Sequence, residues 1–200
     1  MENDKLTSGE ESLAIIHAMI NKAKHQFSDN GHLYLLWGWV VLLCSITQFV
    51  IINYFYTPYH SLVWLLTWLA VIYQAFYLYK RKKQQRVKTY TDEILGSVWL
   101  VFVILMFLFG VMFATILGKD YYLFINPGFL AIYGMPTFLS GIILKFRPLI
   151  FGGICCWVLA ICAAISTPEF HLLFLAAGVI IAWIIPGYIM RSKFKKQQLA

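Results

Sequence analysis

Three residues have side chains that could bind a metal ion: Glu169 and His171, two positions apart, and His60 from a distant segment. Carboxylate and imidazole groups are zinc ligands, and three of them leave a fourth position open for catalysis. Their spacing matches no defined zinc motif. The neighbouring Cys155 and Cys156 have no histidine or acid at ligand spacing. We therefore expect no metal site.

Other kinds of reactive site find no support either. The sequence contains no glycine-rich phosphate loop, no nucleophile elbow and no zinc-protease motif. An enzyme needs an acid, a base or a nucleophile converging in one pocket, and no such set stands out. We therefore expect a non-enzymatic protein without a cofactor.

The elements that must position any site are long apolar runs. Of the 200 residues, 60% are apolar, against roughly 45 to 50% in soluble domains. Six runs of 18 to 24 residues are long enough to cross a bilayer as helices, and they are continuously apolar rather than alternating. The sequence predicts an all-α membrane protein, a bundle of three antiparallel hairpins. The six predicted spans are 33–55, 61–79, 94–117, 123–144, 149–166 and 172–190.

The positive charges are distributed unevenly between the loops. Fifteen of the sixteen Lys and Arg residues fall in segments 1–32, 80–93, 145–148 and 191–200, which leaves only Lys119 in the alternate loops. Because cytoplasmic loops carry an excess of Lys and Arg, both termini are expected in the cytoplasm. The densest cluster is Lys80, Arg81, Lys82 and Lys83. These basic residues are expected to contact anionic lipid headgroups, and no direct nucleic-acid binding is expected.

The segment before the first span, residues 1–32, has the pattern of an amphipathic helix. Apolar residues at spacings of three, four and seven form one seam, and Ser8 with Glu11 makes a capping box. The seam consists of Leu13, Ile16, Ile20 and Phe27. Such a helix either lies in the headgroup layer or serves as a docking or dimerisation helix, and both alternatives stay open.

Polar and small residues within the spans suggest how the helices pack. Gln48 and Thr67 lie at similar depth, which predicts a hydrogen bond between the first two spans. Gly152, Cys156, Ala160 and Ala164 recur every fourth residue, so we expect a smooth face that packs the fifth span against the sixth. Pro136 and Pro186 lie within spans and predict local kinks or breaks.

The opening of the chain resembles a known group of proteins. The pairing of Glu11-Ser12-Leu13-x-x-Ile16-x-x-Met19-Ile20 with Leu35-Leu36-Trp37-Gly38-Trp39-Val40-Val41 is similar to the start of an uncharacterised family of bacterial multi-spanning inner-membrane proteins. The resemblance covers about the first fifty residues. It implies a bacterial inner-membrane location and genes neighbouring those of small winged-helix transcription regulators. It implies no site residue.

Together these patterns predict three parts: a cytoplasmic segment 1–32, a transmembrane domain 33–190 and a basic cytoplasmic tail 191–200. The leading hypothesis is a regulatory or interaction protein that acts through its cytoplasmic face. Its expected partners are the lipid bilayer and either a cytosolic regulator or a second copy of itself. The alternative is a small permease or channel for a neutral or apolar solute, with Pro136 and Pro186 lining a cavity between the fourth and sixth spans.

Overall fold

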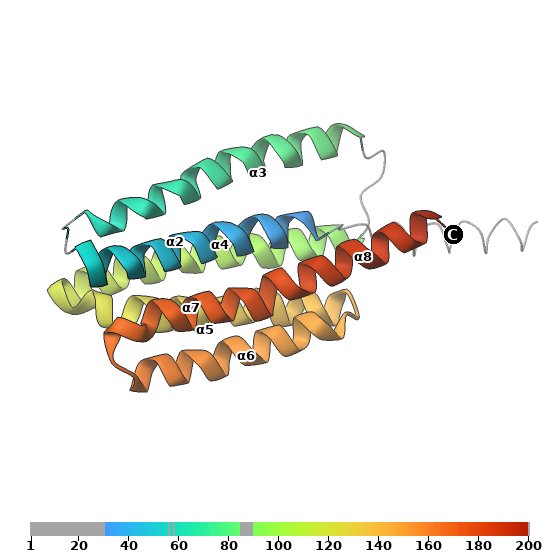
Figure 1. Cartoon of the computed structure of the whole chain (residues 1–200). Helices are drawn as coiled ribbons and strands as arrows, with labels where there is room; N and C mark the ends of the chain where they lie inside the picture. Colours follow the sequence, from blue (N-terminus) through green and yellow to red (C-terminus); the bar gives the residue numbers. More distant parts are fainter. Residues whose placement is uncertain (1–30, 56, 58, 85–89, 200) are drawn as a thin grey trace, which may run out of the picture.

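The protein is described by a computed structural model that covers residues 31–55, 57, 59–84 and 90–199 (Figure 1). Every regular element in these ranges is a helix or a helical turn, which confirms the all-helical prediction. In chain order the elements are α2 (His32–Val50), η1 (Ile51–Phe55), η2 (His60–Trp64), α3 (Leu65–Gln84), α4 (Tyr90–Leu117), η3 (Gly118–Tyr121), α5 (Tyr122–Ile143), α6 (Arg147–Ile165), η4 (Pro168–Phe170), α7 (His171–Val179), η5 (Ile180–Ile184) and α8 (Ile185–Leu199).

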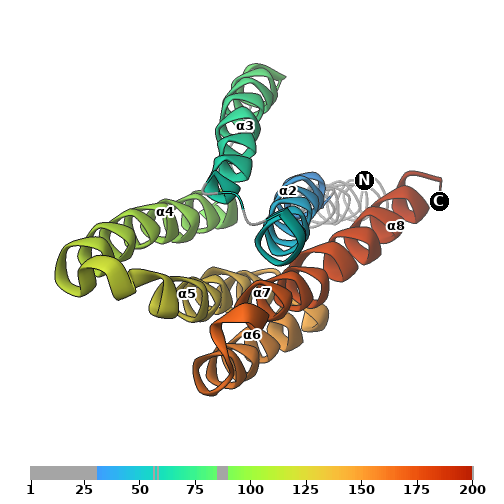
Figure 2. The ribbon, with the colours of Figure 1, turned by 60° about the vertical axis from the view of Figure 1, so that its left-hand side comes forward.

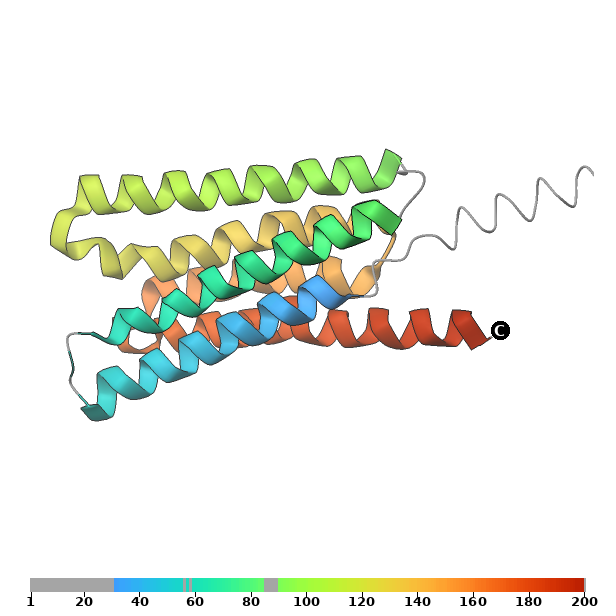
Figure 3. The same cartoon turned by 90° about the horizontal axis from the view of Figure 1, so that it is seen from above.

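The helices have the length and composition of membrane spans. Within the described ranges, five continuous helical stretches are long and apolar enough to cross a bilayer. They are His32–Phe55, His60–Lys83, Tyr90–Ile143, Arg147–Ile165 and Pro168–Lys196. The third stretch holds both α4 and α5, which run side by side from the η3 turn (Figure 3). The chain is therefore an all-α, multi-pass membrane protein.

Glycines bring α5 and α6 into close contact. A methyl group added at Gly153 would lie 2.8 Å from the backbone nitrogen of Phe138 and 2.9 Å from the carbonyl oxygen of Gly134. One added at Gly141 would lie 2.6 Å from the nitrogen of Ile150. Real side chains do not fit at such distances. Small residues let backbones approach in a membrane, where water supplies no force that drives helices together.

The first helix packs along the last segment of the chain. A methyl group added at Gly38 would lie 2.6 Å from the Ile184 side chain, and Gly187 faces Leu35. At the start of α2, Gly31 has a φ of 65° and lies against the backbone of Gly187. Only glycine combines this left-handed conformation with this contact at little cost. Together α2, α5, α6 and the α7–η5–α8 segment form the core.

The other two helices lie at the edge of this core. Helix α4 contains no buried residue, and among the side chains described in α3 only Ala70 is buried. Figure 2 shows α3 splayed away from the other helices, and its far end lies away from the bundle. The two peripheral helices thus expose apolar surface along most of their length.

The two prolines behave differently from each other. Pro136 lies inside α5, which continues through it, so of the predicted kink or break the break does not occur there. Pro186 follows the wide π-helical turn η5. A proline ring clashes with the carbonyl group four residues earlier, and a π turn gives that carbonyl more room.

Candidate functional site

The three candidate metal ligands do not form a site. No group of three or more His, Cys, Asp or Glu residues within the described ranges is placed to hold a metal. The Nδ1 atom of His60 lies 3.0 Å from Nε2 of Gln48, so this imidazole belongs to a hydrogen-bonded network between helices. His171 is buried at the start of α7, whereas Glu169 is exposed.

The predicted hydrogen bond between Gln48 and Thr67 is wrong. Gln48 instead accepts a bond of 2.6 Å from the indole Nε1 of Trp64, and its amide nitrogen meets His60. Thr67 donates to the carbonyl of Trp64 at 2.6 Å, within the continuous stretch formed by η2 and α3. The amide still joins the first two helices, but through different partners. Asn53, near the same end, donates to the carbonyl of Phe49.

A second set of polar contacts joins the first part of α2 to the middle of α3. The indole Nε1 of Trp37 donates to Oε1 of Gln74 over 2.6 Å, and Nε2 of His32 lies 2.9 Å from the hydroxyl of Tyr73. The His32 ring also lies 4.8 Å from that of Tyr77. Helix α3 is therefore attached to α2 by two sets of polar contacts, each with an indole donor and a glutamine acceptor.

Aromatic side chains fill the space where a permease would need a cavity. Trp183 donates to the Thr137 hydroxyl at 2.9 Å, and its ring lies 4.8 Å from that of Tyr133. All three residues are buried. Pro186 is fully buried nearby in sequence, and so it lines no open path. The fourth and sixth predicted spans are packed together here, contrary to the cavity expected from the permease alternative.

Three of the four small residues predicted to pack the fifth span are buried. A methyl group on Gly152 would lie 2.7 Å from Cα of Ala182, and the Cys156 thiol lies 4.0 Å from the carbonyl of Gly178. Ala160 is also buried, but Ala164 is exposed and Ala163 takes its place. A helix turns about 100° per residue, so twelve positions after Gly152 the face has rotated by about 120°, whereas eleven bring it back within about 20°.

The predicted surface contacts divide between two parts of the chain. One part lies outside the described residues: the apolar seam of Leu13, Ile16, Ile20 and Phe27. Residues 85–89, which follow α3, also lie outside them. Lys80, Arg81, Lys82 and Lys83 form the last part of α3. Ten of the eleven described Lys and Arg residues lie at the same end of the bundle, on α3, the α5–α6 turn and α8 (Figure 1). Lys119 is at the other end.

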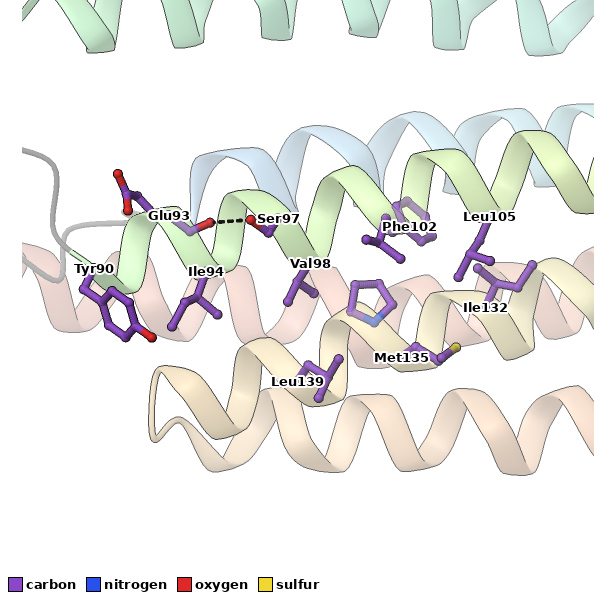
Figure 4. A pocket seen from close by; sticks show the side chains of 12 residues that line it. Tyr90, Glu93, Ile94, Ser97, Val98, Phe102, Leu105, Ile132, Met135 and Leu139 are labelled. Carbon is purple, nitrogen blue, oxygen red and sulfur yellow. Dashed lines mark hydrogen bonds between the residues drawn. The ribbon is translucent and has the colours of Figure 1, made fainter.

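A groove between α4 and α5 is the feature that sequence reasoning missed. It has a volume of about 510 Å³ and is lined almost entirely by apolar side chains (Figure 4). They include Ile94, Val98 and Leu105 from α4 and Ile132, Met135 and Leu139 from α5. Their spacings of three, four and seven are the signal that could have shown one face on each helix. Only the structure shows that these two faces meet.

The end of the bundle that carries these ten Lys and Arg residues is called the basic end below. One of its cations has an aromatic partner. The Nζ atom of Lys193 lies 5.1 Å above the ring of Phe146, within the range of a cation–π interaction. Lys145 and Arg147 precede and follow this buried residue in the sequence, and both are exposed.

No family model, curated protein or solved structure matches the chain.

Proposed function

We propose that this protein is a non-enzymatic, six-span protein of the bacterial inner membrane, with both termini in the cytoplasm, that works as a regulatory or interaction protein through its basic end. The observation that carries the proposal is the segregation of charge: ten described Lys and Arg residues at one end of the bundle and Lys119 at the other. Such an imbalance is typical of the cytoplasmic side.

The count of six spans rests on treating α4 and α5 separately. They contain 28 and 22 residues, and each exceeds the roughly 20 residues that a membrane-crossing helix requires. The turn between them holds the polar residues Lys119 and Asp120. A single helix of that combined length would be far too long for one bilayer.

The filled core favours an interaction role over transport. Thr137, Tyr133 and Trp183 occupy the space between the predicted fourth and sixth spans. Exposed groups at the basic end can instead attract anionic lipids, worth about 1 kcal/mol per charge, or an acidic surface of a cytosolic regulator. The family resemblance makes a small winged-helix regulator the partner to examine first.

Labelling of single introduced cysteines in intact cells tests the orientation. With a reagent that does not cross membranes, we expect labelling of Lys119→Cys but not of Lys83→Cys or Lys195→Cys, against the background of the four native cysteines. Reaction of Lys83→Cys from outside would overturn the orientation.

The interaction role is tested by pull-down of the intact chain and of a variant lacking residues 1–28. A second measurement is binding to anionic vesicles after Lys80, Arg81, Lys82 and Lys83 are replaced by Gln. If neither form recovers a cytosolic protein and vesicle binding is unchanged, the proposed interaction role is wrong.

A further inference from the structure

The groove between α4 and α5 has the lining of a hydrocarbon site. Among its lining residues, polar side chains occur only near the start of α4, at Tyr90, Glu93 and Ser97. The Ser97 hydroxyl donates to the backbone carbonyl of Glu93 at 3.0 Å, so its proton is already used. Figure 4 shows the Glu93 carboxylate pointing away from α5. The deeper part of the groove therefore offers no partner to a polar solute.

The groove also has the length of a lipid chain in one leaflet. From Tyr90 to Leu105 the groove follows α4 over fifteen residue-to-residue steps, which is about 22 Å at a rise of 1.5 Å per residue. Half of the hydrocarbon core measures roughly 15 Å. An acyl chain that enters at the basic end would thus be covered along its whole leaflet. The exposed side chains of Met135 and Leu139 edge the opening.

Charge at the basic end selects the headgroup. On the α5 side, the turn after α5 carries Lys145, and α6 begins with Arg147; both side chains are exposed. On the α4 side, the first turn carries Asp92 and Glu93. A phosphate group would be repelled by the acids and attracted by the two cations. It would therefore lie toward the α5–α6 turn, and its negative charge would favour an anionic lipid over a zwitterionic one.

We propose that the α4–α5 groove binds one acyl chain of an anionic phospholipid, whose phosphate lies against Lys145 and Arg147. This inference rests on the proposed orientation, in which the basic end faces the cytoplasm. The lipid closes the open side of α4, a helix that no other part of the described chain buries. Trp99 and Phe102 of α4 already contact Trp183 and Tyr133 of the core, and such a lipid would fill the remaining space between α4 and α5.

The test measures lipid retained by the full-length protein. The protein is reconstituted in nanodiscs of equal parts phosphatidylglycerol and phosphatidylcholine, released into mild detergent and weighed by native mass spectrometry. We expect one retained phosphatidylglycerol on the wild type. Val98→Trp places an indole in the groove and should lower this retention about tenfold. Met135→Trp, at a more exposed position of the lining, is a second variant in case Val98→Trp fails to fold.

The matched control is Val103→Trp. Val103 lies on α4 but outside the groove lining and is 62% exposed, so the same substitution there should leave retention unchanged. Equal retention by wild type and by a folded groove variant, or equal loss in the control, would overturn the site. If the wild type is a dimer and Val98→Trp is a monomer, a second copy of the chain occupies the groove, and the proposed lipid is wrong.

The headgroup is tested separately. Lys145→Gln and Arg147→Gln should each lower the preference for phosphatidylglycerol over phosphatidylcholine by roughly fivefold, while a chain is still retained. Equal retention of both lipids by the wild type would overturn the assignment of an anionic headgroup. Failure of the orientation would appear instead as external labelling of Lys83→Cys, which does not depend on the groove.

Discussion

The core helices and the peripheral helices are built from similarly apolar sequences, yet almost all of the buried side chains in the described residues lie in the core. The most apolar eighteen-residue window of the described chain belongs to the Tyr90–Ile143 stretch and contains no buried residue. The stretch Pro168–Lys196 is less apolar, but over half of its window is buried. In a soluble protein the more apolar helix would be the more deeply buried one.

The difference follows from the solvent. Lipid tails are as apolar as leucine, so an apolar surface gains little by leaving them, and helices associate through close packing and hydrogen bonds. The core has the means for both: glycines such as Gly134 and Gly153 at the contact, and the bond from Trp183 to Thr137. In α4, by contrast, a methyl group on Gly96 would meet nothing within 4 Å.

Replacing one glycine in the core and one in α4 is the most direct test of the difference in packing between the two regions. Gly153→Val places atoms inside the α5 backbone and should destabilise the protein by about 3 kcal/mol or more, since overpacking usually costs 1 to 3 and the obstacle here is main chain. Gly96→Ala has open space and should be neutral or stabilising by about 0.5 kcal/mol. Thermal unfolding in detergent measures both. Similar melting temperatures for the two variants would contradict the division into core and periphery.

Two neighbouring alanines in α6 offer a finer test. Ala163 is buried at 1% exposure, and Ala164 is exposed. Ala163→Leu should therefore cost about 1 to 3 kcal/mol, whereas Ala164→Leu should lie within about 0.5 kcal/mol of the wild type. Melting temperatures of the two purified variants provide the measurement. The reverse order would show that the face follows an exact four-residue repeat after all.

These two alanines also show how far sequence reasoning reached. Hydropathy was sufficient to predict an all-helical membrane protein, because each long apolar run needs its backbone hydrogen bonds satisfied internally. A repeat of four identified Gly152, Cys156 and Ala160, but drifted off the face by Ala164. The partner of Gln48 was missed for a related reason. Counting residues from the helix ends estimates only the depth of a side chain in the membrane, and it does not show that Trp64 of η2 faces the amide of Gln48 while Thr67 bonds to the carbonyl of Trp64.

Most of the pairing between helices was beyond sequence reasoning; the packing of the fifth span against the sixth is the exception. The faces of α4 and α5 that form the groove are each apolar, and so are the faces exposed to lipid. No difference in hydropathy marks which of them meet. The small residues gave a partial signal: Gly152 and Cys156 predicted the contact of the fifth span with the sixth, whereas the contact of Gly153 with Gly134 of α5 was not predicted. In the same way, only the structure shows that Pro186 is buried and that Pro136 is among the residues that line the groove.

The hydrogen bond in the core should contribute less than its packing. Thr137→Val keeps the shape of the side chain but leaves the indole Nε1 of Trp183 without its acceptor. A buried donor left unpaired costs about 1 to 3 kcal/mol, and measured values for side-chain bonds between membrane helices are at the low end. We expect a loss of about 1 kcal/mol in reversible unfolding. Trp68→Phe on α3, at a 67% exposed indole, is the control and should have no effect. Equal losses in both would show that the loss in Thr137→Val does not come from the buried bond to Trp183.

The smallest effect is expected where α3 is attached to α2. Gln74→Leu removes the acceptor of the Trp37 indole, and bonds of this kind average about 0.6 kcal/mol in membranes. Because α3 has so few buried side chains, this small loss should still alter how often it separates from α2, by a factor of about three. Hydrogen exchange of α3 amides in detergent measures that separation, and Gln74→Glu at high pH, which keeps an acceptor, should restore protection. If exchange in α3 stayed unchanged while exchange in α5 rose, the peripheral helix would be held by something other than these contacts, and the contrast with the core would fail.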